Sequence, residues 1–220
     1  MLRTLAMAAF KRFLVMPMSQ LALGISFVSA ATLAAAQTPA SAVEVRTAKG
    51  QRSSTTIAWK APNAARMQFA VHGKIKNLPY QTKAQLDWLP QGKRYEAAQE
   101  VQIPVLGSRR QASVGHITSS GLQPEIFIDR SRKEYSTTFK PANGQIRFSR
   151  GSEPAPWVSG TQDRMSVFFQ VAGMLAAAPQ RYPAGSTITI QAASSSHVTP
   201  WTFTVRGSEN LQLPAGRMSA

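Results

Sequence analysis

Apolar and polar residues alternate along most of the chain between residues 65 and 150, which is the pattern of half-buried β-strands. From Tyr95 to Ile103, for example, the odd-numbered positions are mostly apolar and lie opposite Glu96, Glu100 and Gln102. Proline and glycine turn signals separate the strands, which we predict at residues 67–72, 84–88, 95–103, 109–118, 125–129, 135–140 and 145–149. Short strands with tight turns between them predict an antiparallel, meander-like sheet.

The pattern changes after residue 160, where apolar residues recur at helical spacing. Thr161 is the predicted cap of a helix over residues 161–178, and Pro179 ends it. Most of its circumference is apolar, and the narrow polar stripe that remains consists of Asp163, Ser166, Gln170 and Gly173. A helix of this kind must be largely enclosed, and the concave side of a curved sheet would enclose it.

Three further strands are predicted at residues 187–192, 201–206 and 210–213. The expected fold class is therefore mainly β. We expect a curved, half-barrel-like antiparallel meander packed around one long apolar helix near residues 161–178. The chain stops soon after Gly216, so we expect strands at the C-terminal end to be missing.

Residues 1–36 have the layout of a secretory signal peptide. Three basic residues precede an apolar run over residues 21–36, and no acidic residue occurs before Glu44. Small residues allow cleavage after Ala36, or as late as Ala42. The apolar run is shorter than the roughly 20 residues that span a bilayer, so cleavage is favoured over an uncleaved anchor. The sequence thus predicts export to the periplasm of a Gram-negative-type envelope, with no stable transmembrane anchor after cleavage.

The segment after the leader, residues 37–64, is rich in small and polar residues. Such a segment buries too little apolar surface to offset the entropy of ordering it, so we expect a flexible tether. Residues 65–220 then form a single β-rich domain.

Composition narrows the chemistry further. The chain has no cysteine, which excludes disulfides, thiol nucleophiles, thiolate zinc sites and a lipid-modified cysteine. Its net charge is +15, and loss of the leader's three cations leaves about +12. For an exported protein this favours anionic envelope components or lipid as partners and argues against nucleic acid. The basic residues are scattered, which indicates a solvated surface, with a site for anionic surfaces as the alternative.

No pattern of catalytic or metal-binding residues is present. His72, His116 and His197 lie far apart and not at metal-ligand spacing. Glu96 and Glu100 share a strand face at roughly 13 Å, which exceeds the separation of about 5–9.5 Å in glycosidase acid pairs. The serines at residues 194–196 form a polar turn. We therefore expect no catalytic residue, metal ligand or cofactor, and the sequence indicates no ligand-binding residue.

Two further groups of residues have structural explanations. Asp163 is expected to interact with exposed amides at the start of the helix. We expect the core to be anchored by Trp88, Trp157 and Trp201. The alternative is that these side chains line a cavity for a ligand.

Four short motifs carry a family resemblance: Leu86-x-Trp88-x-x-x-Gly92-x-x-Tyr95, Gly121-Leu122-x-Pro124, the run from Gln162 to Gln170, and Trp201-x-Phe203-x-Val205. In this order they resemble the bacterial envelope family catalogued as domain of unknown function 3108, over about residues 66–218. The resemblance implies an exported β-rich domain of unknown activity and transfers no functional residue. Similar proteins usually continue past the equivalent of Gly216 through additional strands, whereas this chain stops.

The function expected from the sequence is that of a non-enzymatic binding or envelope-maintenance module. Half-barrels of the predicted kind resemble the carriers that shuttle lipoproteins across the periplasm, which is an analogy of fold alone. Two alternatives compete with it: a hydrolase acting on cell-wall or lipid material, and a basic adaptor on anionic envelope surfaces. The sequence leaves the oligomeric state open.

Overall fold

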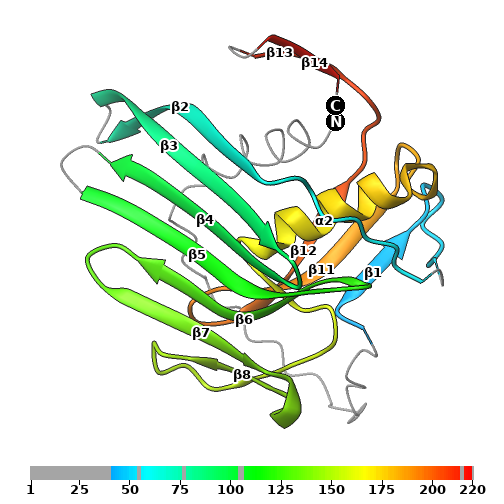
Figure 1. The fold of residues 1–220 in the computed structure, drawn as a ribbon, viewed down its shortest axis with the longest axis horizontal. Helices are drawn as coiled ribbons and strands as arrows, with labels where there is room; N and C mark the ends of the chain where they lie inside the picture. The colour runs from blue at the N-terminus through cyan, green and yellow to red at the C-terminus, as the bar shows by residue number, and fades with distance from the viewer. Residues whose placement is uncertain (1–40, 54–55, 76–77, 104–106, 214–215, 220) are drawn as a thin grey trace, which may run out of the picture.

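The computed structural model describes residues 41–53, 56–75, 78–103, 107–213 and 216–219 (Figure 1). These residues form mainly β structure, with one α-helix, α2 (Ser166–Ala177). The predicted fold class, mainly β with an antiparallel meander sheet, is confirmed. The predicted signal peptide, residues 1–36, lies outside the described residues and stays a prediction.

The larger sheet is an eight-stranded meander in which each strand pairs with the next one in sequence. Its strands are β2 (Ala65–Ile75), β3 (Leu78–Gln91), β4 (Arg94–Ile103), β5 (Gly107–Thr118), β6 (Gly121–Arg130), β7 (Glu134–Lys140), β8 (Gln145–Phe148) and β9 (Ala155–Pro156). The predicted alternation holds on β4, where Tyr95 and Ala97 are buried and Glu96 is exposed. Seven of these strands were predicted, although β3 and β6 begin six and four residues before their predicted starts, and the two-residue β9 was not predicted.

A second sheet lies on the other side of the helix. Its central strand, β11 (Thr187–Ala193), pairs antiparallel with β1 (Val43–Arg46) and β12 (Val198–Thr204). It also pairs in parallel with the two-residue β10 (Gln162–Asp163). A separate hairpin joins β13 (Asn210–Leu213) to β14 (Gly216–Ser219), so strand structure continues to residue 219. The expectation of further strands beyond this chain stays a prediction.

Helix α2 packs against both sheets. Phe169 belongs to the core of the large sheet and stacks on Trp88 with ring centroids 4.3 Å apart. Val167 and Phe168 belong to a second core that contains Ile188 of β11. The prediction that one sheet encloses the helix is therefore incomplete, because a second sheet covers the opposite side of the helix.

The helix is shorter than predicted, with twelve residues instead of the range 161–178. The predicted cap is wrong, because the Thr161 hydroxyl donates to the Val158 carbonyl oxygen at 2.7 Å. The chain then pairs with β11 through β10 before the helix begins. Asp163 performs the capping, since its Oδ1 accepts hydrogen bonds of 2.8 Å from the amides of Met165 and Ser166. The expected interaction of this carboxylate with helix amides is thus confirmed.

The prediction of a flexible tether over residues 37–64 is wrong for the part that the structure describes. β1 forms four residue pairs with β11, so the domain begins before residue 65. Trp59 packs partly buried against both cores and donates from Nε1 to the carbonyl oxygens of Phe169 (3.3 Å) and Gln170 (3.2 Å). Gly173 leaves room for the indole, because a Cβ there would collide with it. These long-range contacts offset the ordering entropy that motivated the prediction.

Candidate functional site

Two buried glutamines hold the start of β6. Gln162 Nε2 donates to the Leu122 carbonyl oxygen at 2.8 Å, and Gln170 Oε1 accepts from the Leu122 amide at 2.8 Å. Gln170 Nε2 also donates to the Ser120 carbonyl oxygen at 3.2 Å. Gly121 lies between these backbone groups with φ +123°, at a point where a side chain would collide with the Gln170 amide. Gln170, from the polar stripe of the helix, is therefore buried and contacts the turn between β5 and β6.

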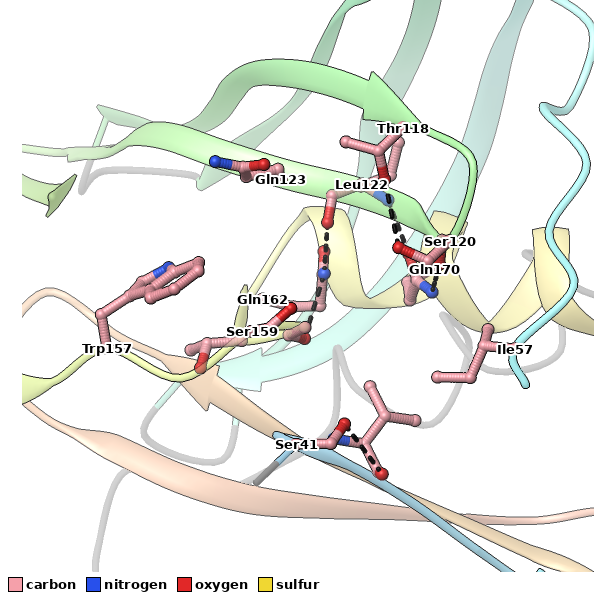
Figure 2. Close-up of a pocket in the computed structure, with 13 residues that line it drawn as sticks. Ser41, Ile57, Thr118, Ser120, Leu122, Gln123, Trp157, Ser159, Gln162 and Gln170 are labelled. Atoms are coloured by element: carbon pink, nitrogen blue, oxygen red, sulfur yellow. Dashed lines mark hydrogen bonds between the residues drawn. The ribbon is translucent and has the colours of Figure 1, made fainter. Parts of the chain in front are cut away.

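A cavity of about 170 Å³ adjoins these glutamines, where the start of β6 meets the loop before β10 and the chain around β1 (Figure 2). Hydroxyl and amide groups dominate its lining, together with a few apolar side chains and Gly160. The lining residues are Ser41, Val43, Ile57, Thr118, Ser120, Leu122, Gln123, Trp157, Ser159, Gly160, Thr161, Gln162 and Gln170. None of them carries a charge, so the cavity suits a neutral polar ligand.

Two polar atoms in this lining have no hydrogen-bond partner among the described residues, although both are buried. They are Trp157 Nε1, a donor, and Gln162 Oε1, an acceptor. A third such atom, Ser186 Oγ, belongs to a residue outside the lining. A buried polar group without a partner costs about 1–3 kcal/mol. Each atom exposes less than 1 Å² of surface, so a molecule in the cavity would bond to it only after a small shift of the lining side chains, and bonding to both would then remove both penalties.

A buried network surrounds Asp163, which is fully buried. Ser113 Oγ donates to Asp163 Oδ2 at 2.5 Å, and the Tyr95 hydroxyl lies 3.0 Å from the same Ser113 oxygen. Burial raises the pKa of Asp163 to about 6, although hydrogen bonds from Ser113, Ser166 and Met165 act in the opposite direction. With neither Asp163 nor Ser113 accessible, we assign this network to structure and not to catalysis.

The carboxylates and histidines considered for hydrolysis contact other partners instead of one another. Glu96 and Glu100 both approach Arg110, at 3.6 and 4.0 Å. The His116 imidazole contacts Glu125 at 2.7 Å. Within the described ranges, no three His, Asp or Glu side chains form a group that could hold a metal ion. The structure therefore brings none of these predicted candidates together into an acid–base pair.

The serine turn brings a histidine close to two hydroxyls. His197 Nδ1 lies 3.2 Å from Ser194 Oγ and 3.0 Å from Ser196 Oγ. Ser194 Oγ also bonds to the backbone of Ser196 and His197, so its role is to close the turn between β11 and β12. In the part of the chain that the structure describes, no carboxylate contacts this imidazole, so the third member of a hydrolytic triad is absent there.

The three tryptophans have different roles. Trp88 is fully buried and donates from Nε1 to the Pro62 carbonyl oxygen at 3.0 Å, which confirms it as a core anchor. Trp201 packs edge-on against Phe168 with ring centroids 5.9 Å apart. Trp157 packs against the core of the large sheet and also lines the cavity. Sequence reasoning missed Gln162 as a lining residue. Its position beside the apolar helix run was the available signal.

No protein-family model, curated protein or solved structure matches this chain. The resemblance to the envelope family therefore stays a prediction. Packing explains the motifs that carry it: Trp88 stacks on Phe169, Gly121 adjoins Gln170, and Phe203 packs on α2. No helix among the described residues has the length and apolar character needed to cross a membrane.

Proposed function

We propose that this protein is an exported, non-enzymatic binding module of a Gram-negative-type envelope, and that its cavity holds a small uncharged ligand bearing hydroxyl groups. The observation that carries the proposal is the pair of buried, unpartnered atoms, Trp157 Nε1 and Gln162 Oε1, in one neutral cavity. Native proteins satisfy nearly all buried polar groups, so two such atoms in one lining indicate a missing partner.

Hydroxyl groups can serve either atom, because a hydroxyl both accepts and donates a hydrogen bond. The hydroxyls of Thr118, Ser159 and Thr161 in the lining extend the same chemistry. The volume of about 170 Å³ lies below the range of about 300–1,000 Å³ that is typical of drug-sized ligands. The ligand class that fits is therefore a polyol or a single sugar unit.

The carrier analogy receives less support from this site. Side chains of α2, including Phe169, occupy the core face of the large sheet where an acyl chain would have to lie. The half-barrel-like shape remains part of our proposal, with the ligand placed beside the helix. A hydrolase has no support in the described residues, because its candidate groups lie apart.

We expect glycerol, glucose or N-acetylglucosamine to show saturation-transfer NMR signals with the exported protein. Trp157→Phe keeps an aromatic ring but removes the indole N–H and part of the ring volume, and should weaken binding at least about tenfold, of which one lost hydrogen bond in a buried site accounts for roughly that factor. Trp201→Phe makes the same chemical change outside the lining and should bind like wild type. The proposal fails if no compound gives a signal, or if Trp157→Phe binds as tightly as wild type. Either result would leave water as the partner of both atoms.

The position of Ala42 makes a separate prediction about export. Ala42 is 5% exposed, its amide donates to the Ser159 carbonyl oxygen (2.9 Å), and its own carbonyl oxygen accepts from the Gln191 amide (3.0 Å). Cleavage after Ala42 would remove both bonds and leave a charged amine at Val43, inside β1. We therefore expect the mature chain to begin at Gln37. Intact mass and N-terminal sequencing of protein from an envelope fraction check this, and a chain starting at Val43 or Met1 would contradict it.

A further inference from the structure

Arg164, directly before α2, carries a half-buried guanidinium that makes no hydrogen bond or ion pair with any described residue. It lies over the Trp201 ring, whose centroid is 5.9 Å from the guanidinium carbon. Several arginines of the large sheet instead have a carboxylate partner, as in the pairs Arg66–Asp87 at 2.7 Å and Arg94–Glu125 at 2.6 Å. Partial burial of a charge without a partner is unfavourable, which indicates that Arg164 lacks an anionic partner here.

The carboxylate near Arg164, that of Asp129, already accepts three hydrogen bonds. Asp129 accepts hydrogen bonds from Arg109 Nε at 2.9 Å and Nη2 at 2.6 Å. Gln111 Nε2 donates to the same carboxylate at 3.2 Å. Asp129 therefore neutralises Arg109 and has little capacity left for Arg164.

A second guanidinium lies near Arg164. Burial lowers the pKa of Arg164, and the charge of Arg109 lowers it further, with Asp129 acting in the opposite direction. Register places Arg109 on the same face of β5 as Ser113, which contacts Asp163 immediately before Arg164. Two guanidiniums thus lie on the helix side of the large sheet. Figure 1 shows that β2–β5 extend well beyond α2 on this side.

We propose that Arg164, together with Arg109 and the Trp201 ring, forms a binding site for a phosphate group. A guanidinium presents a planar fork of N–H donors that matches the oxygens of phosphate, and Arg109 keeps N–H groups that Asp129 does not use. Phosphate carries more charge than a carboxylate and can engage both arginines. This site is distinct from the neutral cavity, and it stands whether or not that cavity binds a hydroxylated ligand.

The phosphate group has two possible sources for an exported protein, a phospholipid headgroup and free phosphate. Both share the chemistry that Arg164 recognises. We therefore test the site with inorganic phosphate and, in a second arm, with vesicles of phosphatidylglycerol in phosphatidylcholine.

The experiment titrates inorganic phosphate into the exported protein in a chloride buffer and follows the indole N–H resonances by NMR. We expect a saturable shift of the Trp201 resonance, assigned with Trp201→Phe. Arg164→Gln should weaken binding at least about tenfold, as expected for loss of a charge-assisted bidentate contact. Arg164→Lys, which keeps the charge and loses the fork, should lie between them. Arg147→Gln removes one exposed cation from β8, a strand that contributes no residue to the site, and is the control.

The outcomes distinguish a lipid source of phosphate from a soluble one and from absence of the site. Loss of both phosphate binding and phosphatidylglycerol sedimentation in Arg164→Gln supports the site with a lipid source. Loss of phosphate binding alone supports it with a soluble source. Equal phosphate binding by wild type and Arg164→Gln, or no saturable shift in wild type, overturns the proposal. If Arg164→Gln does not fold, as judged by circular dichroism, the wild-type Trp201 shift and Arg164→Lys decide instead.

Discussion

Replacement of Asp163 by leucine is expected to lower the free energy of unfolding by about 3–5 kcal/mol, one of the two largest effects that the structure predicts. Leucine removes the acceptor for the amides of Met165 and Ser166 and for the hydroxyl of Ser113. All three donors are buried, and leucine offers none of them an acceptor. Urea unfolding followed by circular dichroism measures the loss, with Leu89→Ala on an exposed site as the control.

Asp163→Asn should instead keep the fold and change its pH dependence. Asparagine keeps one oxygen for the two amides and gains an N–H₂ group for Ser113, whose hydroxyl can then donate to Tyr95. In wild type, burial raises the pKa of Asp163 from 3.8 to about 6, so the folded state binds more protons than the unfolded state between these values. The stabilisation from this group is complete below pH 3.8 and is lost as the pH rises through 6, by about 3 kcal/mol.

The comparison of wild type with Asp163→Asn isolates this effect. Carboxylates with lowered pKa values, such as Asp87, lose their stabilisation as the pH falls, but they are common to both proteins. The difference in unfolding free energy should therefore shift in favour of the variant from pH 4 to pH 7. Parallel curves across this interval would show that Asp163 is not buried as described.

Much of the fold follows from alternation along the chain. The large sheet was predictable because its strands pair with their sequence neighbours, so local turns and strand periodicity determine the order. The start of the helix was not, because the pairing of Gln162 with Ala192 depends on a strand thirty residues away. The prediction of a flexible tether around Trp59 was wrong for the same reason, since the partners of Trp59 lie more than one hundred residues further along the chain.

The candidate site could be predicted only in part. Asp163 was identified as a partner of helix amides because that contact is local in sequence. Of the cavity lining, only Trp157 was named as such from the sequence, as an alternative to a core role, since the cavity forms where Ser41, Leu122 and Trp157 meet from three separate segments. The sequence does not distinguish Arg164 from the other cations, because the ion pairs that the others form depend on the fold. Long-range contacts, which no single segment encodes, determine both proposed sites.

Gly121→Ala should destabilise the protein by about 2–4 kcal/mol, because two unfavourable effects combine at this residue. Its φ of +123° lies in a region that L-residues rarely adopt. A Cβ there would also meet the Gln170 side chain, with Cδ only 2.6 Å away. Gly216→Ala is the matched control, since Gly216 has φ +111° and open space around its Cβ position, so only the backbone effect applies.

A double-mutant cycle with Gln170→Ala separates the two effects. Gln170→Ala alone should cost about 1–3 kcal/mol, because it leaves the Leu122 amide and the Ser120 carbonyl oxygen without this partner. In the double variant the collision is gone, so its destabilisation should fall short of the sum by at least about 1 kcal/mol. If the two losses simply add, Gln170 does not lie against residue 121. The cavity wall that this glutamine forms, and with it the site proposed for a hydroxylated ligand, would then have to be redrawn.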